Sequence, residues 1–186
     1  MIKFTKLQNE EKSIKPEEFL YDGYIKVKSN DGWEYVVEND CVVAMVHLLD
    51  YNEILLRKEI VPPFRERYPS QEFFLTIISG TMEKGEAPID TIKRELVEEA
   101  GILLNTQYSN YQSWGDYFFS KGNTAKCHIF YIPLRVDDFQ KVSATGDGTE
   151  FEKNSNTVRI DLKYLNALKP ADLITCLCIE KMKSVI

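Results

Sequence analysis

The sequence predicts a mixed α/β (α+β) domain in which helices pack on a central sheet. The pattern and the composition both lead to this prediction. Short apolar runs bounded by turn residues alternate along the chain with two segments of helical spacing. The composition, 44% hydrophobic and 28% charged over 186 residues, is ordinary for one globular domain and excludes an intrinsically disordered chain.

Charge and hydropathy exclude several classes of partner. The formal net charge is −6 and no dense basic run occurs, so we expect no nucleic-acid partner. No stretch approaches the roughly 18 consecutive apolar residues of a membrane span, so we expect no membrane partner. The start of the chain has no apolar secretory signal, and the cysteines lack C-x-x-C spacing, which favours a cytoplasmic protein with reduced core thiols. These cysteines are Cys41, Cys127, Cys176 and Cys178.

Residues 1–40 are predicted to form an N-terminal arm followed by a β-hairpin, and residues 41–186 to form the main domain. The first twenty positions are polar and charged, which indicates a loose arm or an edge element. The alternating runs Tyr24–Ser29 and Trp33–Glu38 then flank Asn30-Asp31-Gly32. Asp-Gly between two such runs is a strong signal for a hairpin.

Three apolar strands are predicted next. Cys41–Leu49 is almost entirely apolar, which indicates burial on both faces of a sheet. A second strand, Glu53–Val61, should end at Pro62-Pro63, which we expect to interrupt regular structure before a polar loop. The third strand, Glu72–Ser79, ends at Gly80.

A helix is predicted from Pro88 to about Ala100. Proline suits the first position of a helix, and Gly101 suits the left-handed residue that ends one. The later elements expected are strands at Gln107–Trp114 and Ala125–Arg135, a long mobile loop over 136–156, a short strand at Thr157–Leu162 and a closing helix at Pro170–Met182.

The predicted helix at Pro88–Ala100 carries three carboxylates on one face. At about 100° per residue, Glu95, Glu98 and Glu99 fall within an arc of about 100°. The apolar residues that should face the core lie on the other side of the helix, and they are Ile89, Leu96, Val97 and Ala100. We therefore expect the carboxylates to point together, away from the packing surface.

This grouping of carboxylates costs stability unless something offsets it. Like charges three or four residues apart destabilise a helix by about 0.2–0.5 kcal/mol per pair. Glu98 and Glu99 also lie in the last turn, where the helix dipole disfavours anions by about 0.3–1 kcal/mol. Hard carboxylate oxygens are the ligands that Mg²⁺ and Mn²⁺ prefer, and a divalent cation would cancel the repulsion. With only two histidines in the chain, catalysis would have to rely on carboxylates.

The segment 80–102 resembles the Nudix box, G-x5-E-x7-R-E-U-x-E-E-x-G-U with U an aliphatic residue, at every defined position. The matching residues are Gly80, Glu86, Arg94, Glu95, Leu96, Glu98, Glu99, Gly101 and Ile102. The order of strands, box, strands and final helix is also similar to that of the family. The resemblance implies the Nudix α/β/α sandwich, with a central mixed sheet and the box as a loop–helix–loop.

The same resemblance implies roles for residues of the box. Glu95, Glu98 and Glu99 would be ligands of Mg²⁺ or Mn²⁺, with the backbone carbonyl of Ser79 as a further ligand. One of the glutamates, or a carboxylate elsewhere, would activate the attacking water, so Glu98 and Glu95 are candidate catalytic residues. Arg94 would orient the glutamates.

Outside the box, the resemblance implies five further candidates. Arg57 and Arg65 would contact substrate phosphates, as an arginine on a preceding strand does in enzymes that cleave nucleotide sugars. Tyr117 occupies a region where related hydrolases carry a tyrosine, and it is a candidate for binding the substrate. Glu150 and Glu152, in the predicted mobile loop, are candidates for a catalytic base or an extra ligand.

The function implied is that of a metal-dependent pyrophosphohydrolase. Such an enzyme cleaves a nucleoside diphosphate linked to another moiety, with ADP-ribose or another nucleotide sugar favoured, into a nucleoside monophosphate and a phosphorylated remainder. A small-molecule nucleotide is therefore the expected partner. The N-terminal hairpin is similar to elements with which some of these enzymes form a homodimer.

Two alternatives stay open from the sequence. The chain could hydrolyse (d)NTPs or dinucleoside polyphosphates, because the residues at the entrance of the box, Ile77-Ile78-Ser79-Gly80, depart from the ADP-ribose pattern. It could also be a non-catalytic Nudix-fold regulator that binds a nucleotide. The complete set of glutamates weighs against the regulator, since a binding module has no need of their clustered charge.

Overall fold

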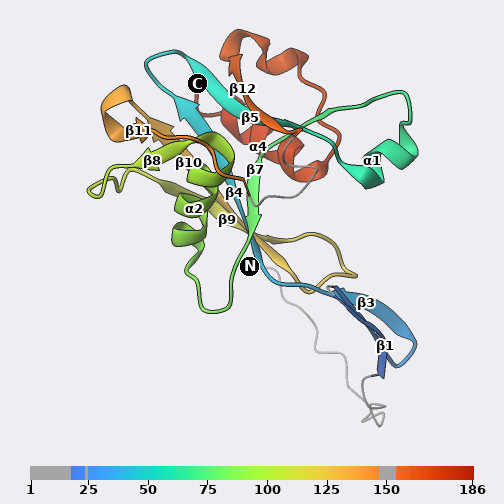
Figure 1. The fold of residues 1–186 in the computed structure, drawn as a ribbon. Coiled ribbons are helices and arrows are strands. Elements are labelled where there is room, and N and C mark those ends of the chain that lie inside the picture. The colour runs from blue at the N-terminus through green and yellow to red at the C-terminus, as the bar shows by residue number, and fades with distance from the viewer. Residues whose placement is uncertain (1–17, 24, 147–153) are drawn as a thin grey trace, which may run out of the picture.

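The structure, a computed structural model, describes residues 18–23, 25–146 and 154–186. In these ranges a mixed sheet of seven strands forms the centre of the molecule (Figure 1). Its main path runs β12-β5-β4-β10-β9, with β6 paired to β5 and β7 paired to β4. The strands are β4 (Cys41–Leu48), β5 (Glu53–Glu59), β6 (Phe74–Thr76), β7 (Ile78–Thr81), β9 (Gln112–Phe118), β10 (Lys126–Leu134) and β12 (Asn156–Asp161).

The middle of the sheet is formed by β4 and β10, which pair in parallel, while their other neighbours are antiparallel. After Cys41, every residue of β4 is buried, as the apolar run predicts. Successive side chains of a strand point to opposite faces. Val42 and Ala44 accordingly join one hydrophobic cluster, and Val43 and Met45 join the other.

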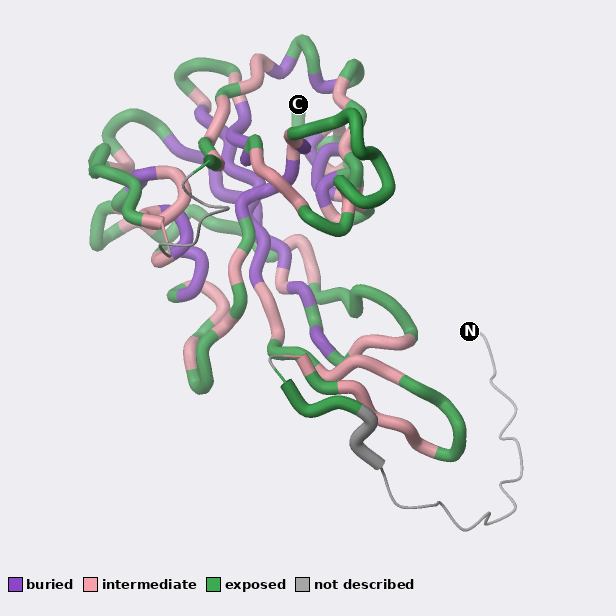
Figure 2. Tube along the Cα trace, turned by 45° about the vertical axis from the view of Figure 1, so that its right-hand side comes forward, coloured by how far each residue is buried: buried purple, intermediate pink, exposed green. Residues whose placement is uncertain are grey.

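Two helices cover the two faces of this sheet. Helix α2 (Pro88–Ala100) packs Ile92 and Leu96 on the cluster of Val42. Helix α4 (Leu173–Lys183) packs Ile179 and Met182 on the opposite cluster. In Figure 2 the buried residues, in purple, gather in the strands between the helices. The predicted mixed α/β/α architecture is therefore confirmed.

The ends of α2 follow the predicted signals. Pro88 lies in the first turn, and Gly101 has a φ of +62° and ends the helix, donating its N–H to the carbonyl of Val97 at 3.1 Å. The next residues form β8 (Ile102–Leu104), which pairs with β11 (Phe139–Lys141) in a small separate sheet. Val142, just after β11, donates its N–H to the carbonyl of Gly101 at 2.9 Å.

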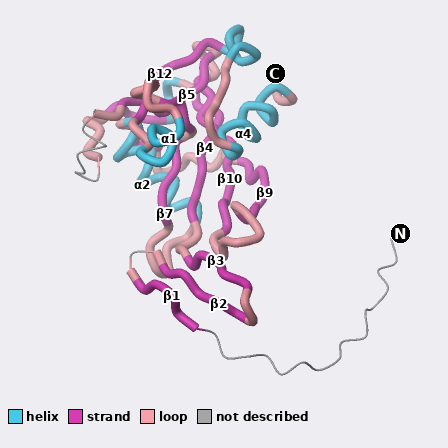
Figure 3. The backbone as a smooth tube through the Cα atoms, turned by 90° about the vertical axis from the view of Figure 1, so that its right-hand side faces the viewer, coloured by secondary structure: helices cyan, strands magenta, loops and turns pink. Residues whose placement is uncertain are grey.

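A second sheet of three strands projects from the central one (Figure 3). It consists of β1 (Glu18–Asp22), β2 (Lys26–Asn30) and β3 (Trp33–Val37). The predicted hairpin is β2–β3, and both central turn residues, Asp31 and Gly32, have positive φ, as a type I′ turn requires. Val36 ties the sheet to the chain before β10, because its N–H donates to the carbonyl of Gly122 at 2.8 Å.

Three of the sequence-based boundaries are wrong. Pro62-Pro63 begins a short helix, α1 (Pro62–Arg67), because proline is compatible with the first turn. The predicted strand Glu72–Ser79 is divided at Ile77 into β6 and β7, which pair with different neighbours. The strand expected at Gln107–Trp114 lies at Gln112–Phe118 instead, and its pairing with β10 fixes this position.

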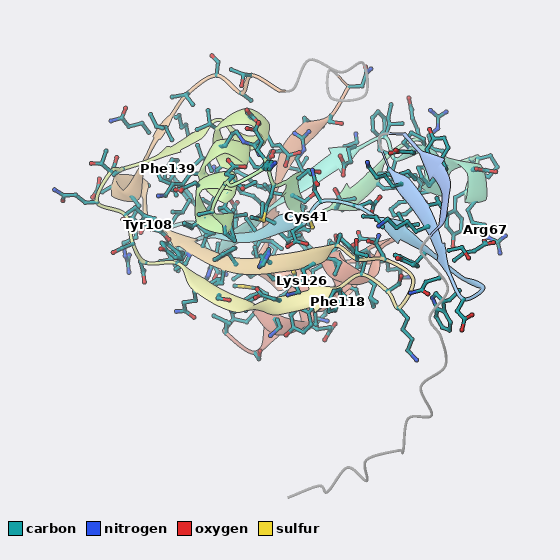
Figure 4. The ribbon with its side chains drawn as sticks, turned by 90° about the horizontal axis from the view of Figure 1, so that it is seen from below. Cys41, Arg67, Tyr108, Phe118, Lys126 and Phe139 are labelled. Carbon is teal, nitrogen blue, oxygen red and sulfur yellow. The ribbon has the colours of Figure 1, made fainter. Side chains whose placement is uncertain are left out.

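The predicted mobile loop at 136–156 begins with regular structure. It contains a 3₁₀ turn, η1 (Val136–Asp138), and β11. Residues 147–153 of that loop, and residues 1–17 of the predicted arm, lie outside the described residues. A second 3₁₀ segment, η2 (Leu162–Ala167), connects β12 to the chain before α4. Figure 4 shows Phe139 and Tyr108 at one end of the molecule, Arg67 at the other, and Cys41 between them.

All four cysteines are free. Cys127 and Cys178 are buried, as expected of core thiols, but Cys176 is exposed on α4, so the expectation of a core position is wrong for that residue. Among the described helices, none has both the length and the apolar character needed to cross a membrane.

Replacing Gly101 with alanine should destabilise the fold. The left-handed backbone alone costs an L-residue about 1–2 kcal/mol, and an added Cβ would lie 2.4 Å from the carbonyl oxygen of Val142. We expect Gly101→Ala to lower the free energy of unfolding in urea by at least about 1–2 kcal/mol. Gly122→Ala is the matched control, because only Ser120 Oγ lies within 4 Å of its Cβ, and it should change stability by less than about 0.5 kcal/mol. Equal effects of the two substitutions would contradict this reading of the end of α2.

Candidate metal centre

The three predicted glutamates lie where the C-terminal half of α2 crosses β7. Glu95 is buried, with 8% of its surface exposed, and it packs on the backbone of Gly80. A Cβ on Gly80 would lie 1.9 Å from Oε1 of Glu95, so only glycine allows this approach. The expectation that all three carboxylates point away from the packing surface is therefore wrong for Glu95, which faces the strand.

Arg94 connects the carboxylates of the box. Its Nη1 donates to Oε1 of Glu95 at 2.6 Å and to Oε2 of Glu98 at 2.9 Å. On its other side, Nε and Nη2 donate to the two oxygens of Glu86, each at 3.3 Å, and Nη2 also donates to the carbonyl of Thr81 at 3.1 Å. The pKa of the guanidinium is raised, chiefly by its hydrogen bond to Glu86. Arg94 thus lies where an orienting residue is expected.

Glu99 is held by different partners. Its Oε2 accepts the N–H of Ser79 at 3.3 Å, and its Oε1 lies 3.4 Å from Nε of Arg57. Nη1 of Arg57 and the hydroxyl of Thr157 both donate to the backbone carbonyl of Glu99, at 3.1 and 2.8 Å. A cation at the end of a helix stabilises its dipole, so Arg57 offsets part of the cost of carboxylates in the last turn.

The site carries more negative than positive charge. Among the described residues, four carboxylates of the box form ion pairs with the two guanidiniums of Arg94 and Arg57, and they belong to Glu86, Glu95, Glu98 and Glu99. The pKa of Glu99 is raised to about 8, chiefly by burial; the charge of Arg57 opposes this rise, and the charges of Glu95 and Glu59 add to it. The excess is about two negative charges when all four carboxylates are ionised, and about one when Glu99 is protonated, as its raised pKa favours at pH 7. Hard oxygen donors with an excess of this size fit a divalent cation.

In the described residues, no three His, Cys, Asp or Glu side chains are already arranged around one point as a metal site. Arg94 keeps the carboxylates of Glu95 and Glu98 from converging on a common point, because its Nη1 lies between them and donates to both. A cation at this point would therefore share these oxygens with Arg94.

A hollow of about 440 Å³ opens in front of the carboxylates, and we call it the glutamate hollow. It lies between the box helix and β7 and is lined by Asn39, Ser79, Gly80, Thr81, Met82, Glu83, Arg94, Glu95, Glu98 and Glu99. Ser79 therefore lines the same hollow as the three glutamates, and its N–H donates to Oε2 of Glu99. Its role as a ligand stays a prediction.

A second hollow, of about 430 Å³, lies at the end of α2. Its walls include Arg57, Glu98, Glu99 and Thr157. Residues 144–146 and 155–157 also line this hollow, and the N–H of Gly146 donates to the carbonyl of Glu98 at 3.1 Å. Glu150 and Glu152 belong to the segment between these residues, which lies outside the described residues, so their roles stay predictions.

The structure places the three predicted substrate-binding residues in different surroundings. Arg57 is 5% exposed and binds Glu99, so it is not a solvated residue at a strand end, although it lines the second hollow. Arg65 is exposed on α1, and no residue of α1 lines the glutamate hollow. Tyr117 is exposed on β9, and its hydroxyl donates to the carbonyl of Trp114 at 3.1 Å. Of these three residues, Arg57 is the one that contacts a glutamate of the box, Glu99.

Sequence reasoning missed two residues at the site. Glu59 raises the pKa of Glu99 and accepts a hydrogen bond from the hydroxyl of Thr76. It lies two positions after Arg57 on β5, so the period of a strand could have placed both on one face. Thr157 comes from β12, which pairs with β5 at Arg57. No signal in the sequence predicts that pairing.

Comparisons with known proteins agree with this architecture. The model of the NUDIX domain family matches residues 40–168, well over half of the chain. The structure is similar to a crystal structure of an ADP compounds hydrolase, with a TM-score of 0.68 and 17% sequence identity, over 96% of each chain. At that identity the likeness shows the fold alone. A search of curated proteins by sequence found no match.

The bond between Glu86 and Arg94 should make stability depend on pH. Hydrogen bonds from Arg94 and, second, from the N–H of Glu83 lower the pKa of Glu86 from 4.5 to about 2. A carboxylate whose pKa is lowered by folding stabilises the native state above its unfolded pKa, and this contribution is lost as the pH falls through the folded value. Glu86→Gln should therefore lower the free energy of unfolding at pH 7, without metal, by roughly 1 kcal/mol, given the partial exposure of the pair.

The measurement is urea denaturation in EDTA at several pH values. The difference between wild type and Glu86→Gln should be constant above about pH 5 and should shrink as the pH falls from 4.5 towards 2. Glu66→Gln, on the exposed surface of α1, should show no such dependence. A difference that grew on acidification would contradict the assigned direction.

Proposed function

We propose that this chain, which belongs to the Nudix family and is a Nudix pyrophosphohydrolase, needs Mg²⁺ or Mn²⁺. We also propose that it cleaves nucleotide sugars such as ADP-ribose. Water would attack one phosphorus of the diphosphate and the bridging P–O bond would break. The products would be a nucleoside monophosphate and a phosphorylated remainder, which for ADP-ribose is ribose 5-phosphate.

The observation that carries this proposal is the excess of negative charge in the glutamate hollow. Glu95, Glu98 and Glu99, with the carbonyl of Ser79, would hold the cation. A bound divalent cation lowers the pKa of water and neutralises charge that develops on phosphate oxygens. Without a cation, the same carboxylates would repel the diphosphate of the substrate.

The other residues of the site would position these carboxylates. Arg94 holds Glu95 and Glu98 through one nitrogen, and Arg57 holds Glu99 from the strand below. Glu98 is the most accessible of the three, with 28% of its side chain exposed against 10% for the others. We therefore assign to Glu98 the removal of the proton from the attacking water. Glu150 and Glu152 are the alternatives for this role.

The choice of a nucleotide sugar is supported by the likeness to an ADP compounds hydrolase over nearly the whole chain. The alternatives are hydrolysis of (d)NTPs or dinucleoside polyphosphates, and binding of a nucleotide without turnover.

We also propose that the molecule is a homodimer through the sheet β1–β3, where Tyr21 and Trp33 are 57% and 61% exposed.

A panel of substrates separates these alternatives. Purified protein would be incubated with nucleotide sugars, dinucleoside polyphosphates and (d)NTPs, each with Mg²⁺, with Mn²⁺ and with EDTA, and the products would be resolved by anion-exchange chromatography. We expect nucleoside monophosphate from nucleotide sugars, and no turnover in EDTA. Release of pyrophosphate from (d)NTPs would favour a triphosphatase, and binding without any turnover would favour the regulator.

Glu98→Gln tests the assigned proton acceptor. Glutamine keeps an oxygen that can accept from Arg94, but it can neither take the proton nor bind a cation with a full charge. We expect kcat to fall by at least about 100-fold, while urea denaturation shifts by less than about 0.5 kcal/mol. Glu66→Gln, the same change on the exposed surface of α1, should keep full activity. Loss of activity through unfolding of Glu98→Gln would count against the role.

A further inference from the structure

A third hollow, of about 490 Å³, opens on the other side of β7, and we call it the aromatic hollow. It shares Ser79, Gly80 and Thr81 with the glutamate hollow, so the two are neighbours along three successive residues of one strand. Its other walls come from the start of α4, from α1 and from the chain after β9. Cys41, labelled near the middle of Figure 4, is one of its lining residues.

The walls of the aromatic hollow suit a flat apolar ring. Phe64 and Phe119 line it, together with aliphatic residues such as Ile77 and Ile174. Phe64 is held in place by an edge-to-face contact with the buried Phe74, with ring centroids 5.3 Å apart. Phe119 is 41% exposed and therefore available to a ligand. Stacking of a base on an aromatic side chain is worth about 1–3 kcal/mol.

The charged groups of this hollow suit hydrogen-bond donors and not anions. Its described lining includes the carboxylates of Glu59 and Asp172 and no Lys, Arg or His. A phosphate or a carboxylate would be repelled there. The charged part of a nucleotide would therefore stay on the cation side of β7, and an uncharged ring with N–H groups would enter the aromatic hollow.

Asp172 offers an unused acceptor. Its Oδ1 accepts the N–H of Thr175 at 2.7 Å and caps α4, while its Oδ2 is buried and has no hydrogen-bond partner among the described residues. An unsatisfied buried acceptor is costly and rare. A donor from a ligand would satisfy it. Because Oδ2 is shielded from water in the free chain, this contact requires a small shift of the first turn of α4.

We propose that the aromatic hollow binds the nucleobase of the substrate, and that Asp172 selects a base with an exocyclic amino group. Adenine is the simplest such base, since its amino group is the only donor on the edge of its ring in a nucleotide. This inference rests on the proposed function for the identity of the substrate. It adds that the base and the phosphates lie on opposite sides of β7.

The test compares two probes that differ only in the amino group. Binding of AMP and of purine riboside 5′-monophosphate, in which hydrogen replaces the amino group, would be measured by calorimetry with Mg²⁺. We expect wild type to bind AMP about tenfold or more tightly, as for a hydrogen bond to a charged acceptor. Asp172→Asn should abolish this preference, because the amide presents a donor to the amino group, while asparagine still caps α4 and preserves the fold.

Phe119→Ala tests the stacking wall separately. It should weaken both probes about equally, by about tenfold, because every base has a π-face. Phe118→Ala is the matched control, since Phe118 is more exposed, at 59%, and does not line the aromatic hollow. It should leave both affinities unchanged.

For the best substrate of the panel, Asp172→Asn should raise KM by about tenfold and leave kcat within about threefold.

The outcomes distinguish the base site from the function. Turnover of nucleotide sugars with equal binding of the two probes would overturn the base site and leave the function intact. Preference for AMP without turnover on the whole panel would support the base site and overturn the function. An Asp172→Asn variant that folds, as judged by urea denaturation, and keeps the preference would overturn the role of Asp172.

Discussion

The site depends on carboxylates that are packed more closely than their charge favours. Gly80 lets Glu95 reach the backbone of β7, the guanidinium of Arg94 holds Glu95 and Glu98, and that of Arg57 lies against Glu99. Two positive charges do not neutralise four ionised carboxylates, so the site keeps an excess of negative charge. Removing a partner from a buried charge costs more than the pair contributes, which explains why these two arginines are tied to several acceptors at once.

The parts of the structure that rest on local physics could be predicted from the sequence. The bounds of α2 follow from Pro88 and Gly101, and the turn of the hairpin follows from Asp31-Gly32, because each of these residues has a conformational preference of its own. The buried strand β4 follows from its apolar run. The glutamates could be grouped because helical spacing alone decides which of them share a face.

The parts that rest on contacts between elements could not be predicted. Glu95 is buried because β7 passes beside α2, and Arg57 meets Glu99 because β5 lies under the end of that helix. Period and propensity contain no information on such crossings. The position of β9 was wrong for the same reason, since its pairing with β10 decides which residues belong to the strand. The resemblance makes Arg65 a candidate phosphate ligand, but Arg65 lies on α1, and no residue of α1 lines the glutamate hollow.

The charge of the glutamate hollow also limits what a binding protein without catalysis could do. Its only described basic side chain is Arg94, which already donates to three carboxylates and a carbonyl. A diphosphate placed there without a cation would meet net negative charge, whether or not it is later cleaved. A divalent cation would therefore be needed to bind a diphosphate in this hollow, whether or not the bond is then cleaved. Because a binding protein and an enzyme would share this requirement, cleavage of a phosphoanhydride bond is the measurement that distinguishes them.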